Sequence, residues 1–174
     1  ARPGAVFSDF LRKAAAGGLC VCPHAGEEWH DKAGENIVQA VEDGATRIGH
    51  GIHALATEAT GLPKAVADRL AALGASSLCD LLVQKDVTLE VCITSNSLIK
   101  STEPMRYGAS PVKLLIDAGV KVVLCSDDPG MWGDALGTCM HKEVEQALAA
   151  GVTREQVGEC MARAFSISTA APAA

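Results

Sequence analysis

Four short apolar segments, separated by segments with helical spacing, constrain the fold of this chain most. They occupy residues 19–22, 46–51, 87–96 and 121–129. As a set they are rich in Val, Leu, Ile and Cys and show little alternation of polar and apolar residues, which indicates strands buried on both faces. Because helices separate the strands, the sequence predicts an α/β fold with a parallel sheet covered by helices.

Apolar residues recur at helical spacing between these strands, and capping signals mark several ends. The predicted helices cover residues 7–16, 33–43, 110–119, 138–150 and 153–165, and residues 63–86 form one or two more. Pro111 stands in the first turn of its helix and Gly119 follows the end, the usual positions of these residues. Thr153, followed by Gln156, is typical of a helix N-cap.

The alternation of strand and helix matches the repeating unit of a TIM-type barrel. A closed barrel needs eight strands and about 250 residues, whereas this chain has 174 residues and four predicted strands. We therefore expect half of a (β/α)8 barrel, with residues 1–168 as the half-barrel and residues 169–174 as a flexible tail. No strand is followed by a glycine-rich phosphate loop, which argues against a nucleotide-cofactor domain.

Charge and composition exclude several classes of partner. The formal net charge is −6 and the chain has only three Phe, two Trp and one Tyr, so we expect no nucleic-acid binding. No apolar run approaches the roughly 20 residues that cross a bilayer, so we expect no membrane insertion. The seven cysteines are scattered without C-x-x-C spacing, which favours reduced, mostly buried thiols in the cytoplasm or another reducing, soluble compartment.

Polar side chains with catalytic potential follow the predicted strands. His24 and Glu27 follow the first strand, and His50 ends the second between two glycines. The third and fourth strands end in residues 94–96 and 126–129, and the latter include Asp127 and Asp128. Taken singly, a histidine at a strand end is more often structural, and Asp-Asp-Pro is an ordinary turn or helix start. Because parallel strands end at one face, we expect these side chains to converge on a functional site.

Imidazole and carboxylate groups at strand ends suit a catalytic divalent metal, with zinc the first choice. The remaining acid and histidine would then move protons around a metal-bound water. Neither G-x-S-x-G nor H-E-x-x-H is present in the sequence. A Ser126-based triad is a weak competitor, because Ser126 and Asp127 are adjacent and face opposite ways on a strand.

Four motifs together resemble the adenosine deaminase family. They are HAGE at 24–27, RIGHG at 47–51, LEVCITSN at 89–96 and SDDP at 126–129, in this order. The chain also resembles the growth-factor-like deaminases of that family. At position 49 its glycine resembles the adenosine-type members, whereas adenine-type members tend to have Asp there. The resemblance implies a (β/α)8 barrel that uses zinc to hydrolyse adenosine, or a related purine, to inosine and ammonia. It makes the four predicted strands barrel strands five to eight.

The resemblance also implies a role for each strand-end residue. His24 and Asp127 are expected to be zinc ligands. Glu27 is expected to protonate the purine ring nitrogen beside the reacting carbon. His50 is expected to orient and deprotonate the attacking water, and Asp128 to hydrogen-bond the purine.

One part of the family pattern is missing from this sequence. The family binds zinc with an additional His-x-His pair, whereas the five histidines here stand at 24, 30, 50, 53 and 141. Two ligands are too few for a catalytic zinc, which normally has at least three from the protein. We expect either an enzyme completed by a complementary half-barrel, upstream or on a partner subunit, or a catalytically inactive half-barrel that serves as a structural subunit. A related hydrolase acting on another amidine or amide is a third possibility.

Among the remaining histidines, His30 and His141 are expected on the surface. His53 is either structural or lines the mouth of the site.

Overall fold

The computed structural model describes residues 3–29, 32–98, 107, 109–131 and 139–169. Its centre is one parallel sheet with strand order β1-β2-β3-β4. The strands are β1 (His24–Ala25), β2 (Arg47–His50), β3 (Thr88–Val91) and β4 (Lys121–Leu124). Strand order follows chain order, as expected of successive β/α units. The prediction of a parallel α/β half-barrel is therefore confirmed.

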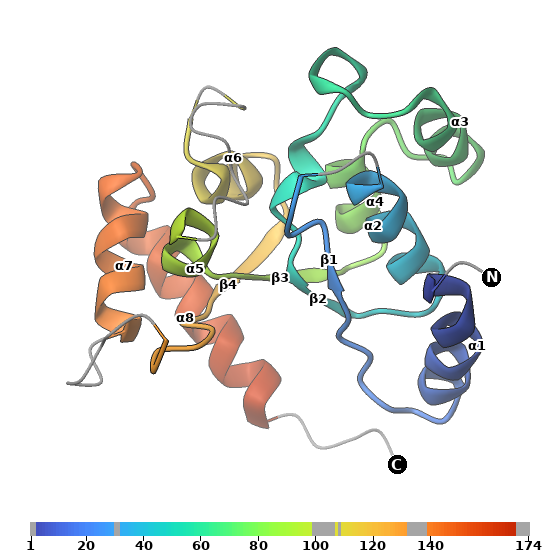
Figure 1. The fold of residues 1–174 in the computed structure, drawn as a ribbon. Coiled ribbons are helices and arrows are strands. Elements are labelled where there is room, and N and C mark those ends of the chain that lie inside the picture. Colours follow the sequence, from blue (N-terminus) through green and yellow to red (C-terminus); the bar gives the residue numbers. More distant parts are fainter. Residues whose placement is uncertain (1–2, 30–31, 99–106, 108, 132–138, 170–174) are drawn as a thin grey trace.

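Helices follow each strand and surround the sheet (Figure 1). They are α1 (Pro3–Ala16), α2 (Ala33–Glu42), α3 (Lys64–Ala72), α4 (Leu78–Gln84), α5 (Ile93–Leu98), α6 (Pro111–Asp117), α7 (Cys139–Ala149) and α8 (Arg154–Thr169). Two short 3-10 helices, η1 (Ile52–Leu55) and η2 (Glu58–Thr60), follow β2. Helices α1 to α4 gather beside the β1 end of the sheet, and α5 to α8 gather beside the β4 end (Figure 1).

The core lies between the sheet and the helices. Ile48, Leu89 and Val122 stand in register across β2, β3 and β4, and each is 0% exposed. They form one apolar cluster with buried residues of α2, α4 and α6, among them Ile37, Leu81 and Leu115. Side chains alternate along a strand, so this register puts all three on the same face.

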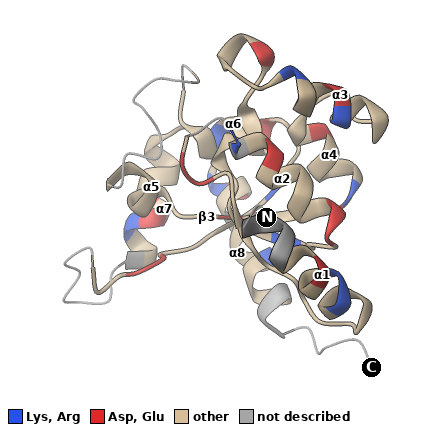
Figure 2. Ribbon diagram, turned by 45° about the vertical axis from the view of Figure 1, so that its right-hand side comes forward, with Lys and Arg blue, Asp and Glu red and all other residues tan. Residues whose placement is uncertain are grey.

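The opposite face of the sheet is mixed, since its alternate positions include charged residues as well as the buried Val123. Arg47 of β2 and Glu90 of β3 form an ion pair, with side chains 31% and 20% exposed. Elsewhere, acidic and basic residues are interspersed along α1, α3 and α7 (Figure 2).

The capping signals of the sequence are confirmed. Thr153 Oγ1 accepts a hydrogen bond from Gln156 N at 3.1 Å, and Thr153 N donates to Gln156 Oε1 at 3.0 Å. Pro111 occupies the first turn of α6. Residues 63–86 form two helices, and Ser77 caps the second by accepting from Asp80 N at 3.0 Å.

Three predicted strands are wrong in extent. The first was expected at 19–22, whereas β1 comprises only His24–Ala25. The third was expected to run to residue 96, whereas β3 ends at Val91 and residues 93–98 form α5. The fourth was expected at 121–129, whereas β4 ends at Leu124. The last helix is longer than expected and reaches Thr169, and the rest of the predicted tail lies outside the described residues.

The cysteines are less buried than the sequence predicted. The six cysteines whose side chains the structure describes are all free, with Cys20 and Cys22 exposed and Cys92 and Cys160 buried. The side chain of Cys139 lies outside the described part. Within the described ranges, no helix combines the length and the apolar character that a membrane span requires.

Candidate active site

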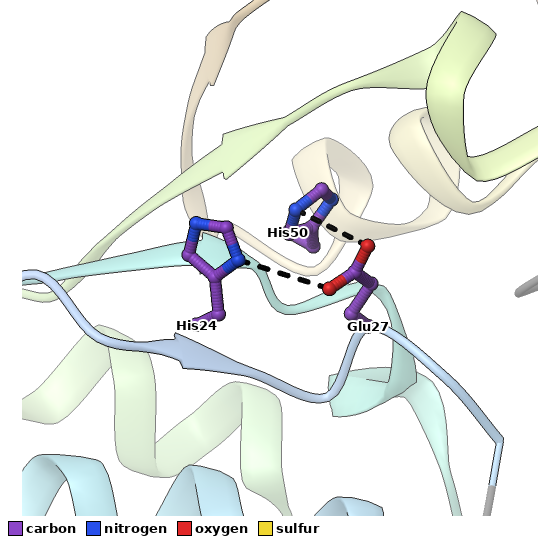
Figure 3. Close-up of side chains that lie close together, drawn as sticks. All are labelled: His24, Glu27 and His50. Carbon is purple, nitrogen blue, oxygen red and sulfur yellow. Dashed lines mark ion pairs between the residues drawn. The ribbon is translucent and has the colours of Figure 1, made fainter. Parts of the chain in front are cut away.

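The turn after β1 places Glu27 between two histidines. Gly26 adopts a φ of +65°, and a Cβ there would lie 2.5 Å from Ile37 Cδ1. A residue with a side chain would therefore be both strained and blocked at this position. The turn brings Glu27 Oε2 to 3.8 Å from His24 Nδ1 and Glu27 Oε1 to 3.5 Å from His50 Nε2 (Figure 3).

The two histidines pack against each other across β1 and β2. Their ring centroids are 4.8 Å apart and their planes make an angle of 79°. A Cβ on Gly49 would lie 2.5 Å from His24 Cδ2, so the ring of His24 occupies the space above this glycine. The His24 side chain is 67% exposed, whereas His50 is 2% exposed. One imidazole is thus accessible, and the other is fixed inside the protein.

Contacts from α5 hold two of the expected site residues, His50 and Asp127. The Asn96 amide Nδ2 lies 3.1 Å from His50 Nδ1, and Ser95 Oγ donates to Asp127 Oδ2 at 2.6 Å. Both Ser95 and Asn96 are buried. The contact with Asn96 occupies Nδ1 of His50, so the ring presents Nε2 to Glu27.

Backbone strain marks the same region. Three non-glycine residues of the described part have positive φ, namely His50 at 63°, Asp86 at 56° and Asp127 at 55°. Such conformations are uncommon and cluster at functional sites. Two of the three are residues that the sequence assigned to the site.

The potential metal-binding atoms form two groups that share His50. Donor atoms of His24, Glu27 and His50 lie within 4.8 Å of one another, and so do those of His50, Cys92 and Asp127. The structure therefore brings together four of the five predicted site residues. The fifth, Asp128, is exposed and belongs to neither group.

Sequence reasoning missed Cys92 and Glu143. Hydrogen bonding with Cys125, together with burial, raises the pKa of Cys92, while the same hydrogen bond lowers the pKa of Cys125. Glu143 is 1% exposed and accepts from Ile93 N at 2.6 Å and Thr94 N at 3.1 Å. Glu143 stands three residues after Met140 and four before Ala147, which puts it on the apolar face of α7. This helical spacing was the sequence signal that its carboxylate is buried.

The remaining histidines differ in environment. His53 is 0% exposed, and its Nδ1 lies 2.6 Å from Tyr107 Oη. Its ring meets Trp29 edge-on with centroids 5.1 Å apart, and its backbone N–H donates to Gly26 O at 3.1 Å. His53 therefore supports the turn that carries Glu27. His141 is exposed, as predicted, and lies 3.1 Å from Glu145, and His30 lies outside the described residues.

Comparison with known proteins agrees with the motifs. The family model described as adenosine deaminase matches residues 1–173. The chain belongs to the adenosine deaminase family. It is 33% identical over 157 residues to the adenosine deaminase of Escherichia coli O7:K1, a match that covers 89% of this chain and 39% of that protein. The adenosine deaminase of Escherichia coli strain SE11 gives the same identity and coverage.

A solved structure supports the fold. The crystal structure of an adenine deaminase from Arthrobacter aurescens superposes with a TM-score of 0.69 at 22% identity, over 98% of this chain and 45% of that one. This chain of the adenosine deaminase family thus spans less than half the length of the relatives it matches.

Proposed function

We propose that this chain is the C-terminal half-barrel, strands five to eight, of a zinc-dependent enzyme that hydrolyses adenosine to inosine and ammonia. The observation that carries the proposal is the meeting of His24, Glu27 and Asp127 around His50. These side chains come from the ends of β1, β2 and β4, which is where barrel enzymes build their sites. The family membership of the chain supports the reaction class.

His24 and Asp127 are the proposed zinc ligands of this chain. Imidazole and carboxylate are suitable donors for zinc, and the exposure of His24 leaves its ring accessible to an ion. When bound, zinc supplies an activated water at neutral pH. The His-x-His ligands of the family do not occur in this chain, so in the proposed enzyme this pair comes from residues outside it.

Glu27 is the proposed proton donor to the purine. Attack on the carbon that bears the amino group builds negative charge on the neighbouring ring nitrogen, and a carboxyl group placed there can neutralise it. Glu27 is held by the turn at Gly26 and by the facing imidazoles at 3.5 and 3.8 Å. His50 accepts the proton of the attacking water, and Asp128, exposed beside Asp127, hydrogen-bonds the purine.

The second candidate function is a catalytically inactive structural subunit. The observation that favours it is the absence of His-x-His from the sequence, which leaves fewer ligands than a catalytic zinc requires. In that case the strand-end residues would be inherited, and the sheet would be completed by a partner that brings no ligands.

Zinc content and turnover of the native protein that contains this chain distinguish the two functions. If the protein is the proposed enzyme, it should contain one zinc per chain, and the ultraviolet absorbance of adenosine should fall as inosine forms. Replacement Glu27→Gln should abolish turnover and leave zinc bound, because the amide cannot protonate the purine. The matched control is Glu28→Gln, at the exposed neighbouring position, which should leave turnover unchanged. Absence of both zinc and turnover in the native protein would favour the structural subunit.

A further inference from the structure

Glu143 is a buried carboxylate that none of the four motifs contains. It lies on α7 and is 1% exposed. Burial of a carboxylate is costly unless hydrogen bonds compensate it. Here the compensation comes from the first turn of α5, where Ile93 N donates to Oε2 at 2.6 Å and Thr94 N donates to Oε1 at 3.1 Å. Glu143 therefore acts as a cap supplied by another helix, 50 residues along the chain.

A second contact ties the same two helices together. Gln146, one turn after Glu143 on α7, donates through Nε2 to Thr94 Oγ1 at 2.6 Å. Helix α5 has only six residues, and a helix of this length has little stability of its own in water. A negative charge at its N-terminus is favourable, because the first N–H groups of a helix have no partner within it. The position of α5 thus depends on α7.

The residues that follow this capped turn touch the candidate active site. Ser95 donates to Asp127 at 2.6 Å, and Asn96 contacts His50 at 3.1 Å. Hydrogen bonds and a few residues of α5 backbone therefore connect Glu143 to Asp127 and His50. Any shift of α5 would move both contacts together.

We propose that Glu143 is a positioning residue of the active site, which acts through α5 to hold Asp127 and His50 in their working positions. The inference rests on the proposed function for its effect on turnover. It assigns to α7 an indirect influence, through α5, on a proposed zinc ligand and a proposed proton acceptor. Neither Glu27 nor Asp128 contacts α5 through a hydrogen bond given for the described residues, although Glu27 lies 3.5 Å from His50 and Asp128 follows Asp127, so we expect Glu143 to affect kcat more than KM.

Three variants of the native protein test the proposal. In Glu143→Ala both backbone N–H groups lose their acceptor, whereas Glu143→Gln keeps one neutral acceptor and guards against misfolding of the alanine variant. Glu145→Gln, on the exposed face of the same helix, is the matched control. Hydrogen–deuterium exchange of the peptide covering residues 92–98 reports the anchoring of α5, and kcat and KM for adenosine report the site.

We expect faster exchange of this peptide in both Glu143 variants, with the larger change in Glu143→Ala. We expect kcat to fall by about 10- to 100-fold, the usual effect of losing an outer partner of a metal site, while KM stays within about twofold. Glu145→Gln should change neither quantity. A structural role alone would change exchange and stability without this selective loss of kcat.

A double-mutant cycle tests the route. If Glu143 acts through Ser95, the kcat loss in the Glu143→Gln, Ser95→Ala double variant should be smaller than the product of the single losses. Unchanged exchange at residues 92–98, or faster exchange with unchanged kcat, would overturn the proposal. Absence of zinc and turnover in the wild-type protein would instead refute the proposed function. In that event the exchange data, and the effect of Glu143→Gln on the NMR shifts of the His50 ring, would still decide whether Glu143 positions α5 and His50.

Discussion

Substitution by alanine should have different consequences at two glycines beside the candidate site, Gly49 and Gly51. At both Gly49 and Gly51 an added Cβ would lie 2.5 Å from a neighbouring side-chain carbon. At Gly49 that carbon belongs to His24, which is 67% exposed and can rotate away. At Gly51 it belongs to Leu89, which is 0% exposed, and the backbone has a φ of +64°.

The magnitudes follow from these differences. Gly51→Ala forces a strained backbone, at about 1–2 kcal/mol, and overpacks the core, at about 1–3 kcal/mol. We therefore expect the free energy of unfolding to fall by about 2–5 kcal/mol. Gly49 has no positive φ, so in Gly49→Ala the ring of His24 moves and the loss of unfolding free energy stays under about 1 kcal/mol. Displacement of this proposed ligand should weaken zinc binding by at least about 10-fold, the lower value for loss of a mere outer partner of a metal site.

Urea denaturation and competitive zinc titration of the two variants measure these quantities. The predicted outcome is a crossed pattern, in which Gly49→Ala loses zinc affinity with near-normal stability and Gly51→Ala loses stability. Equal destabilisation by both substitutions would refute the reasoning from side-chain mobility. Normal zinc affinity in Gly49→Ala would refute the proposed role of His24.

Two further predictions concern regions away from the site. Asp43 is 2% exposed and accepts hydrogen bonds from Ser8 Oγ at 2.6 Å and Arg12 Nε at 2.8 Å, so Asp43→Asn should cost about 1–3 kcal/mol in urea denaturation; an unchanged midpoint would contradict this. Burial raises the pKa of Cys79 to about 11, so at pH 8 only about one thiol in a thousand is ionised. Mass spectrometry should show negligible alkylation of native Cys79 at pH 8 and faster alkylation as the pH rises, and rapid labelling at pH 8 would contradict the stated burial.

The sequence predicted the layout of the sheet because local patterns determine it. Apolar runs separated by amphipathic segments identify β2 and β4 without knowledge of the fold. β1 was misplaced because its length depends on its partner: His24 and Ala25 pair with Gly49 and His50, and Pro23 lacks the N–H that a longer ladder would use. Residues 19–22 have the composition of a strand but lie before this ladder.

Helix α5 could not be predicted from local sequence. Thr94, Ser95 and Asn96 are all poor helix formers, so the apolar run before them indicated a continuing strand. The helix is capped instead by Glu143, 50 residues further on. A contact at that separation leaves no trace in the local pattern, although a carboxylate on the apolar face of α7 was a sign that a buried partner exists.

Part of the candidate site could also be predicted from the sequence. His24, Glu27, His50 and Asp127 were identified because each stands at a strand end within a family motif, and the structure brings their donor atoms close together. The contact of Asn96 with His50 and that of Ser95 with Asp127 depend on α5. They became visible only once the helix was known.

The central claim is that His24 and Asp127 hold a metal ion in a working active site. Anomalous X-ray diffraction at the zinc absorption edge, on crystals of the native protein that contains this chain, tests it most directly. One anomalous peak is expected between His24 and Asp127, within about 2.0–2.2 Å of a nitrogen and an oxygen ligand. Zinc-equilibrated crystals without a peak at this position, or with zinc bound elsewhere, would show that these residues are not the metal ligands.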